Sequence, residues 1–272
     1  MSSNEAARGR PAPRLIAFVS LAFITGSAMH SPALHYQIIS QSIEQEILAG
    51  RIQAQGKLPA ERQLAQTFAT TRITLREALA LLEGKGLIYR ENRRGWYVSP
   101  PRLRYNPTER ASFNELVTAQ GRLGHTRLLT SQLAYPTPEV AQTMGLPAFT
   151  QSWNLQRLRS LDGRVVLLEE NHVCASCCPD LDRHDLSQSL TRLFEEHYQL
   201  HLARTQIQFY PVILEGERAS LLGLTPGSSA LFIRRLNFDQ AGRLYELDHE
   251  YWRHDALVIE LERVSDPQAR QP

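Results

Sequence analysis

The chain has 272 residues, of which 42% are hydrophobic and 21% are charged, and its formal net charge is +2 at pH 7. This balance excludes collagen-like, coiled-coil and intrinsically disordered chains, and the length suits about two domains of ordinary size. The isoelectric point of about 8.5 is only mildly basic. Binding to nucleic acid would therefore depend on where the basic residues lie and not on their total.

The first thirty residues have the layout of a secretory signal peptide, with a basic flank, a short apolar core over 15–24 and small residues over 25–28. The core is shorter than the about 20 apolar residues that span a bilayer. Alternatively, translation starts at Met29 and the preceding residues are upstream sequence, which is the interpretation we favour. We expect 1–30 to be a signal-like or mis-assigned segment, and the protein to be cytoplasmic without membrane association.

Residues 31–100 predict a small domain of three helices closed by a hairpin. Apolar residues at helical spacing begin at Tyr36, and Gly50 ends that helix. A second helix is expected over 61–68, and Thr71 is suited to cap a third helix that runs to about Glu83. The buried stripe of the third helix is expected to be Leu75, Ala78, Leu79 and Leu82. Two strand-like runs follow, over 87–90 and 96–99, which completes a winged helix-turn-helix.

In that fold the start of the third helix enters the major groove of DNA, while the hairpin lies against the backbone or the minor groove. Arg72 and Arg76 are four residues apart and project from one face of the third helix. Further arginines lie on the neighbouring elements. The alternative is a small helical domain whose arginines form a solvated face.

Three ordered strings in this domain carry a family resemblance: LPAERQLA over 58–65, TRITLREAL over 71–79 and GLI over 86–88. Together they resemble the DNA-binding domain of GntR-family bacterial transcription regulators. The resemblance implies a homodimer on double-stranded operator DNA. It implies DNA contacts from Arg62, Thr71, Arg72, Thr74, Arg76, Arg94 and the wing glycine, Gly95. The chain departs from many relatives at Trp96, where they carry a small residue or threonine.

We expect residues 101–107 to form a linker, 108–264 a second domain and 265–272 a flexible tail. The second domain contains an internal repeat, because AQTMGLP over 141–147 recurs in kind as ASLLGLTP over 219–226. The spacing from Gly145 to Gly223 also separates Arg157 from Arg235. We expect two helix-plus-hairpin units that share one antiparallel sheet in an α+β domain. Chance similarity between two hairpins is the alternative.

One strand of this domain, over 151–160, predicts a pocket. Its period-two pattern puts two arginines on an apolar face, in the order Trp153, Leu155, Arg157 and Arg159. The return strand brings acids and a histidine near them, namely Glu169, Glu170 and His172. Guanidinium groups fit phosphate or phosphonate and carboxylates fit an amine, so the pocket suits a small zwitterion with an anionic head. A purely structural Arg–Glu network is the alternative.

Residues from about 105 to 263 resemble the UTRA effector-binding domain of the HutC subfamily, whose fold is similar to that of chorismate lyase. The resemblance implies an effector pocket lined by Asn114, Arg157, Glu169, Ser189, Glu246 and Tyr251, with Arg253 in the closing motif, and the strand argument adds Arg159 and Glu170. Relatives often have serine or threonine in place of Asn114. The strings RRGW over 93–96, ENH over 170–172 and EYWRHD over 250–255 resemble regulators of 2-aminoethylphosphonate utilisation operons. That resemblance implies a small anionic effector, 2-aminoethylphosphonate.

The sequence contains few signals for metal binding or catalysis. Soft ligands cluster at His172, Cys174, Cys177 and Cys178, but the second cysteine pair of a structural zinc site is missing, and we expect neither metal nor cofactor. No G-x-S-x-G elbow or glycine-rich phosphate loop is present. We therefore expect a regulator and not an enzyme. A lyase-like enzyme, a regulator that senses a sugar phosphate or an amino-acid catabolite, and an exported binding protein are the alternatives.

Overall fold

The computed structural model describes residues 32–91, 94–109 and 111–262. It divides into two compact units, residues 1–100 and 101–272. The signal-like segment over 1–30 and the tail over 265–272 lie outside the described residues. Within the described part of the chain, no helix has both the length and the apolar character needed to cross a membrane.

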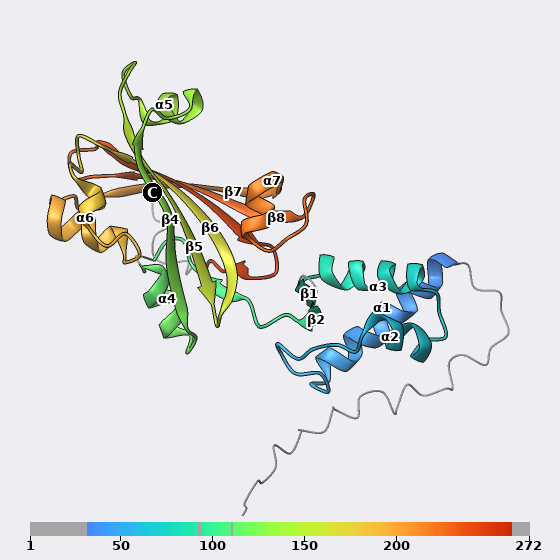
Figure 1. Ribbon diagram of the computed structural model, residues 1–272. Helices are drawn as coiled ribbons and strands as arrows, with labels where there is room; N and C mark the ends of the chain where they lie inside the picture. Colours follow the sequence, from blue (N-terminus) through green and yellow to red (C-terminus); the bar gives the residue numbers. More distant parts are fainter. Residues whose placement is uncertain (1–31, 92–93, 110, 263–272) are drawn as a thin grey trace, which may run out of the picture. The chain divides into compact units, whose positions relative to one another are not determined.

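The first unit is a winged helix-turn-helix (Figure 1). Its helices are α1 (Pro32–Leu48), α2 (Glu61–Thr67) and α3 (Arg72–Gly84), and its antiparallel wing consists of β1 (Ile88–Glu91) and β2 (Gly95–Val98). Thr71 caps α3 as the sequence predicts, since its side-chain oxygen accepts a 3.2 Å hydrogen bond from the Thr74 amide. The four residues of the predicted stripe are completely buried in the core of this unit.

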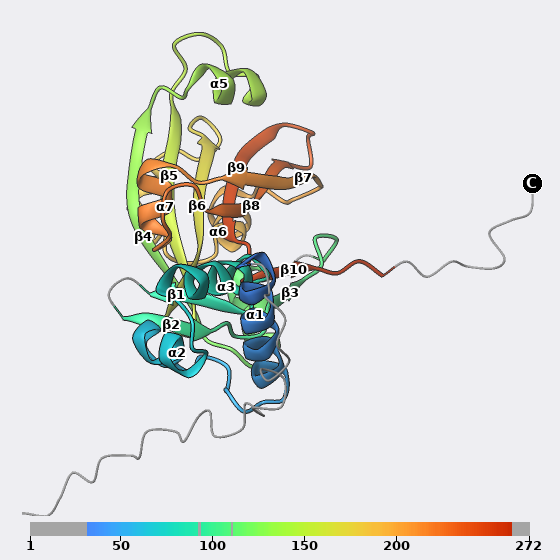
Figure 2. The ribbon, with the colours of Figure 1, turned by 90° about the vertical axis from the view of Figure 1, so that its right-hand side faces the viewer.

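The second unit is built on a six-stranded antiparallel sheet (Figures 1 and 2). The strands lie in the order β4-β5-β6-β9-β8-β7. Their bounds are β4 (Gly124–Ala134), β5 (Ser152–Leu161), β6 (Arg164–Cys174), β7 (Arg204–Ile213), β8 (Ser229–Phe238) and β9 (Leu244–Arg253). The helices are α4 (Phe113–Ala119), α5 (Pro138–Met144), α6 (Leu190–Tyr198) and α7 (Gly216–Leu221), and a short 3-10 turn, η2 (Leu181–Arg183), precedes α6.

The repeat is larger than the sequence analysis predicted. The succession α4-β4-α5-β5-β6 is repeated as α6-β7-α7-β8-β9, and the two copies meet where β6 pairs with β9. The repeated glycines have a backbone reason, because Gly145 and Gly223 both adopt the left-handed conformation within two residues of the end of a helix, with φ values of 62° and 65°. The duplication explains why the strand order reads symmetrically from the centre of the sheet.

The sheet has helices on both faces. Phe113 and Val117 of α4 and Leu193 and Phe194 of α6 belong to clusters on one face, and Figure 1 shows both helices on that side. On the opposite face, α5 and α7 pack against the sheet, with Ala219 of α7 buried beside other apolar side chains. Alternate residues of each strand therefore belong to different environments.

The segment expected to be a linker is partly a strand. Residues Leu103–Tyr105 form β3, which pairs in parallel with β10 (Leu257–Ile259) near the other end of this unit. Leu103 is completely buried, and Leu257 lies in the same core cluster. The polar, proline-flanked composition suggested a linker, but the contact with a segment remote in sequence makes residues 103–105 part of the second unit.

Candidate functional site

The predicted DNA-contacting residues lie mainly on the surface of the first unit. Arg62, Thr71, Arg72, Arg76 and Arg94 are exposed, whereas Thr74 and Gly95 are half-buried. Thr71 and Thr74 meet through their hydroxyl groups at 3.0 Å at the start of α3. The sequence analysis did not single out Ile73, which is 74% exposed in the same turn. An apolar side chain at that place is suited to contact a thymine methyl group.

Glu61 connects α2 with both α3 and the wing. Its Oε2 accepts a 3.0 Å hydrogen bond from Arg76 Nε, and its Oε1 accepts one of 3.2 Å from Trp96 Nε1. Trp96 is only 7% exposed and belongs to the core of the unit. The tryptophan that departs from many relatives is therefore a packing residue, and the charged surface of the wing comes from residues such as Arg94.

The second unit contains a cavity of about 1240 Å³ on the face of the sheet that α4 and α6 cover. Six predicted effector residues line it, namely Asn114, Arg157, Arg159, Glu169, Ser189 and Glu246. Asn114 lies at the start of α4, and Ser189 caps α6, where its Oγ accepts a 3.3 Å hydrogen bond from the Arg192 amide. The other four project from the central strands.

Arg157 is 1% exposed, and each nitrogen of its guanidinium group has a partner. Nε donates to Asn171 Oδ1 at 3.1 Å, Nη1 donates to the carbonyl of Gln188 at 3.2 Å, and Nη2 forms an ion pair with Glu169. Arg157 therefore holds β5, β6 and the segment before α6 together, as in the structural network that the sequence left open as an alternative.

Arg159 shares the same carboxylate. Its Nε and Nη2 donate to Glu169 at 3.1 and 2.8 Å, and its guanidinium carbon lies 4.9 Å from the ring centre of Phe113. Burial would raise the pKa of Glu169, but the guanidinium groups of Arg157 and Arg159 outweigh it and hold that pKa below its ordinary value. Glu169 is therefore an ionised carboxylate between two arginines.

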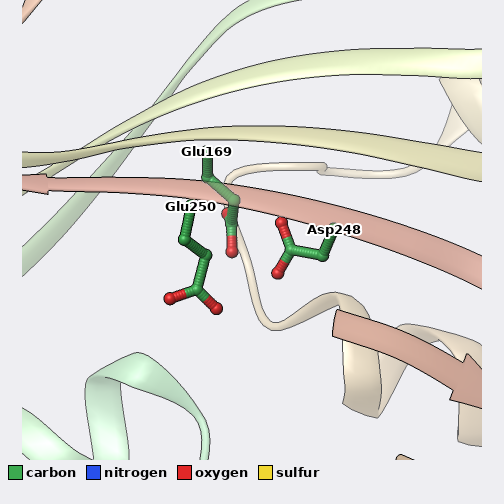
Figure 3. A group of neighbouring side chains, drawn as sticks. All are labelled: Glu169, Asp248 and Glu250. Carbon is green, nitrogen blue, oxygen red and sulfur yellow. The ribbon is translucent and has the colours of Figure 1, made fainter. Parts of the chain in front are cut away.

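Four carboxyl groups converge on the cavity floor, and Figure 3 shows three of them, Glu169, Asp248 and Glu250, extending from β6 and β9. Glu250 accepts hydrogen bonds from Arg235 and from Trp252 Nε1, and Glu246 accepts hydrogen bonds from Asn171 and Asn237. Arg235 also donates to the hydroxyl group of Tyr105. Asp248 is 5% exposed, and its Oδ1 has no hydrogen-bond partner among the described residues.

The carboxyl groups differ in the direction in which their pKa values are shifted. Burial, together with the neighbouring carboxylates of Glu169 and Glu250, raises the pKa of Asp248 well above its ordinary value. Burial also raises the pKa of Glu246, although the hydrogen bond from Asn237 opposes that change. The cavity floor therefore combines a carboxyl group of lowered pKa, Glu169, with one of raised pKa, Asp248.

Two predicted effector residues, Glu170 and Tyr251, are corrected by the strand register. Both lie on the face of the sheet opposite the cavity, because neighbouring residues of a strand point to opposite faces. Glu170 pairs there with Arg218 of α7, whose guanidinium carbon lies 4.6 Å from the ring centre of Tyr251. Neither residue lines the cavity.

The histidine and the cysteines that the sequence places close together make separate contacts. His172 Nδ1 lies 2.7 Å from Asn154 Oδ1, and burial lowers the pKa of His172 to about 4. Cys174 begins a tight turn that ends at the completely buried Cys178, whose carbonyl accepts a 2.8 Å hydrogen bond from Trp153 Nε1. Among the described residues, the group with metal-ligand spacing is Glu169, Asp248 and Glu250.

A helix-turn-helix unit is the means by which a class of DNA-binding proteins places a helix in the major groove, and in this chain a duplicated α+β unit follows it. Residues 35–98 match the family of bacterial regulatory proteins named gntR, and residues 119–257 match the UTRA domain. The chain therefore belongs to the GntR family of transcription regulators and carries a UTRA domain.

Individual relatives agree with this assignment. The uncharacterized HTH-type transcriptional regulator YihL of Escherichia coli K12 is 31% identical over 209 residues, which are 76% of this chain and 89% of YihL. The HTH-type transcriptional repressor NagR of Bacillus subtilis is 28% identical over 234 residues, which are 85% and 96% of the two chains. The crystal structure of PhnF from Mycobacterium smegmatis is similar in fold, with a TM-score of 0.59, 24% identity and coverage of 84% of this chain and 100% of PhnF.

Proposed function

We propose that the protein is a cytoplasmic, homodimeric regulator whose binding to operator DNA responds to a small charged effector, and that it controls the transport and degradation of phosphonates. The observation that carries this proposal is a large cavity with a charged floor in the unit that follows the DNA-binding unit. Two-fold symmetry of the protein would be matched by two operator half-sites about 10 bp apart, or at a multiple of that spacing.

On the DNA side, Arg62, Thr71, Arg72, Thr74, Arg76, Arg94 and Gly95 supply the contacts. Arg72 stands at the exposed start of α3 and is our choice for reading a guanine edge. Arg76 would have to break its hydrogen bond with Glu61 before it could contact a base or a phosphate. The loss of that hydrogen bond reduces the contribution of Arg76 to the free energy of DNA binding. Thr71 and Thr74 would position the helix on the backbone.

On the effector side, we propose 2-aminoethylphosphonate as the ligand. The hydrogen bonds of Arg159 to Glu169 use Nε and Nη2, which leaves Nη1 for an anionic group. Ser189 at the start of α6 also lines the cavity, and because the start of a helix favours an anion, the two features together suit a phosphonate. Asn114 would close the site from α4, while Glu169 and Glu246 would form part of its charged floor.

The size of the cavity favours a second candidate within the same class. Ligand cavities generally enclose about 300–1,000 Å³, and 2-aminoethylphosphonate would leave much of the 1240 Å³ to water. A larger phosphorylated metabolite, such as a sugar phosphate, would fill more of it. No lyase-like reaction is proposed, since the relatives that match most of the chain are transcription regulators.

Thermal unfolding of the full chain with 2-aminoethylphosphonate, with a sugar phosphate and with inorganic phosphate tests the assignment. A ligand that binds only the native state stabilises it by about 2.7 kcal/mol at one hundred times its dissociation constant. We expect a selective rise in melting temperature with 2-aminoethylphosphonate. A selective rise in melting temperature with the sugar phosphate instead would favour the second candidate, a regulator that senses a larger phosphorylated metabolite. No change in melting temperature at millimolar 2-aminoethylphosphonate would refute the phosphonate assignment.

A further inference from the structure

The two copies of the repeat differ in which carboxylate the equivalent arginine pairs with. In the first copy Arg157 lies directly across the β5–β6 hairpin from Glu169 and forms an ion pair with it. In the second copy Arg235 occupies the equivalent place and lies directly across the β8–β9 hairpin from Asp248. Arg235 nevertheless pairs with Glu250, the next residue on the same face of β9. The carboxyl group that corresponds to Glu169 is therefore left without its arginine.

Chain length accounts for this difference. The side chain of aspartate is one methylene shorter than that of glutamate, and Arg235 is fixed by Glu250 on one side and by the hydroxyl group of Tyr105 on the other. Asp248 lines the cavity and is 5% exposed, and its buried Oδ1 has no hydrogen-bond partner among the described residues. A buried polar atom without a hydrogen bond is costly unless a ligand satisfies it.

A divalent cation fits this place poorly. Although Glu169, Asp248 and Glu250 have metal-ligand spacing, both oxygens of Glu169 accept hydrogen bonds from Arg159. The two oxygens of Glu250 are used by Arg235 and by Trp252 Nε1. A metal ion would displace these donors and would lie beside guanidinium groups of its own sign. Asp248 alone offers a free oxygen, which suits a single N–H donor.

The balance of charge on the cavity floor points to a cationic donor. The guanidinium groups of Arg157, Arg159 and Arg235 are paired with Glu169 and Glu250, whereas Glu246 is held by two neutral amides. No arginine of the described residues is paired with Asp248, so an ionised Asp248 has no counter-charge of its own. A positively charged hydrogen-bond donor supplies both the charge and the proton that this oxygen lacks.

We propose that Asp248 is the residue that recognises a protonated amine, and that the effectors of this protein are small molecules that carry a primary ammonium group. The inference rests on the proposed role of the cavity as the effector site. Charged and titratable groups face Asp248 from all the surrounding strands: Tyr105, Arg157, Glu169, Arg235, Glu246 and Glu250. Their carboxylates and the burial raise the pKa of Asp248, so below that raised pKa the binding of an ammonium group expels the carboxyl proton to solvent and leaves an ammonium–carboxylate pair.

Isothermal titration of the full chain with matched ligand pairs tests the proposal. The pairs are 2-aminoethylphosphonate with ethylphosphonate, and glucosamine 6-phosphate with glucose 6-phosphate, which in each case differ by the amine. In at least one pair we expect the wild type to bind the amine-containing member about tenfold more tightly or better, as hydrogen bonds to charged groups allow. Asp248→Asn keeps the shape and removes the charge, and it should abolish that preference.

A control variant and a folding check accompany the titration. Glu170→Gln makes the same chemical change on the opposite face of the sheet and should retain the preference of the wild type. Asp248→Asn should melt at the same temperature as the wild type or higher, because it removes a buried carboxyl group that lacks a partner.

Each outcome of the titration decides the inference. The inference would be overturned by an amine preference that survives Asp248→Asn, by equal affinities within both pairs, by a preference for the amine-free members, or by no binding of any of the four ligands. If the amino sugar pair alone shows a preference that depends on Asp248, the inference stands and the phosphonate assignment fails. If the phosphonate pair shows it, both stand.

Discussion

Replacing Glu169 by glutamine should destabilise the second unit strongly while preserving the volume of the side chain. Glu169 is 4% exposed and forms ion pairs with both Arg157 and Arg159. Glutamine would retain one acceptor oxygen and would present an amide donor to a guanidinium group. Two arginines would then remain beneath α4 and α6 without their shared counter-charge.

The magnitude follows from the burial of the group. Breaking a buried ion pair by removing one partner costs about 3–5 kcal/mol, whereas exposed pairs contribute about 0–1 kcal/mol. A change of about 3–5 kcal/mol lowers the melting temperature of a unit of this size by roughly 6 to 20 °C. The matched control is Glu170→Gln, since Glu170 pairs with the half-exposed Arg218 and should lose about 1 kcal/mol or less.

The assay is differential scanning calorimetry of the full chain, in which the transition of the second unit is followed through the pH range. The pKa of Glu169 is depressed in the folded state, so its stabilisation is present above the ordinary value of 4.5 and is lost as the pH falls through the folded value. The difference between the wild type and Glu169→Gln should therefore shrink in acid. Equal losses for Glu169→Gln and Glu170→Gln, or a difference that does not depend on pH, would refute the buried network.

Three further predictions concern separate parts of the molecule. Arg72→Ala should weaken operator binding by about 1–3 kcal/mol in a fluorescence anisotropy titration and leave effector binding intact, and a loss of effector binding would contradict the division between the units. Cys174, whose pKa is lowered to about 5 by its hydrogen bond with Cys177, should be alkylated by iodoacetamide at neutral pH long before the completely buried Cys178, as mass spectrometry would show. The affinity for an amine-containing effector, relative to its amine-free partner, should increase as the pH rises through the raised pKa of Asp248, and a flat ratio in the wild type would contradict that assignment.

The winged helix-turn-helix could be predicted closely because its signals are local. Thr71 precedes the apolar stripe of α3 and caps it, and the glycines after α1 and α3 end those helices where the sequence suggests. The strand β3 gave no such signal, since three residues beside prolines look like a linker until they pair with β10 at the far end of the unit. Contacts between remote segments are not encoded in local composition.

The cavity was predictable in part. The period-two pattern of β5 placed Arg157 and Arg159 on the face that the cavity occupies, and the repeat related Arg235 to Arg157 without assigning it to the pocket. Glu170 was misplaced because the strand argument counted neighbouring residues of the return strand together, and Tyr251 was misplaced because a resemblance supplies residue identities only. The parity of a strand decides which face each residue occupies. Asp248 had no signal in the sequence, since its open oxygen depends on which of two carboxylates Arg235 reaches.

The central claim, that DNA binding by this GntR-family chain responds to an effector, is tested most directly by one titration. Fragments of the source genome that the full chain retains are selected, and its affinity for the best fragment is measured by fluorescence anisotropy with and without 2-aminoethylphosphonate and the amino sugar phosphate. Coupling between two sites is commonly about 1–3 kcal/mol, so we expect one of these ligands to change operator affinity by roughly 5- to 150-fold. An operator affinity that stays constant while calorimetry shows the same ligand bound would contradict the account.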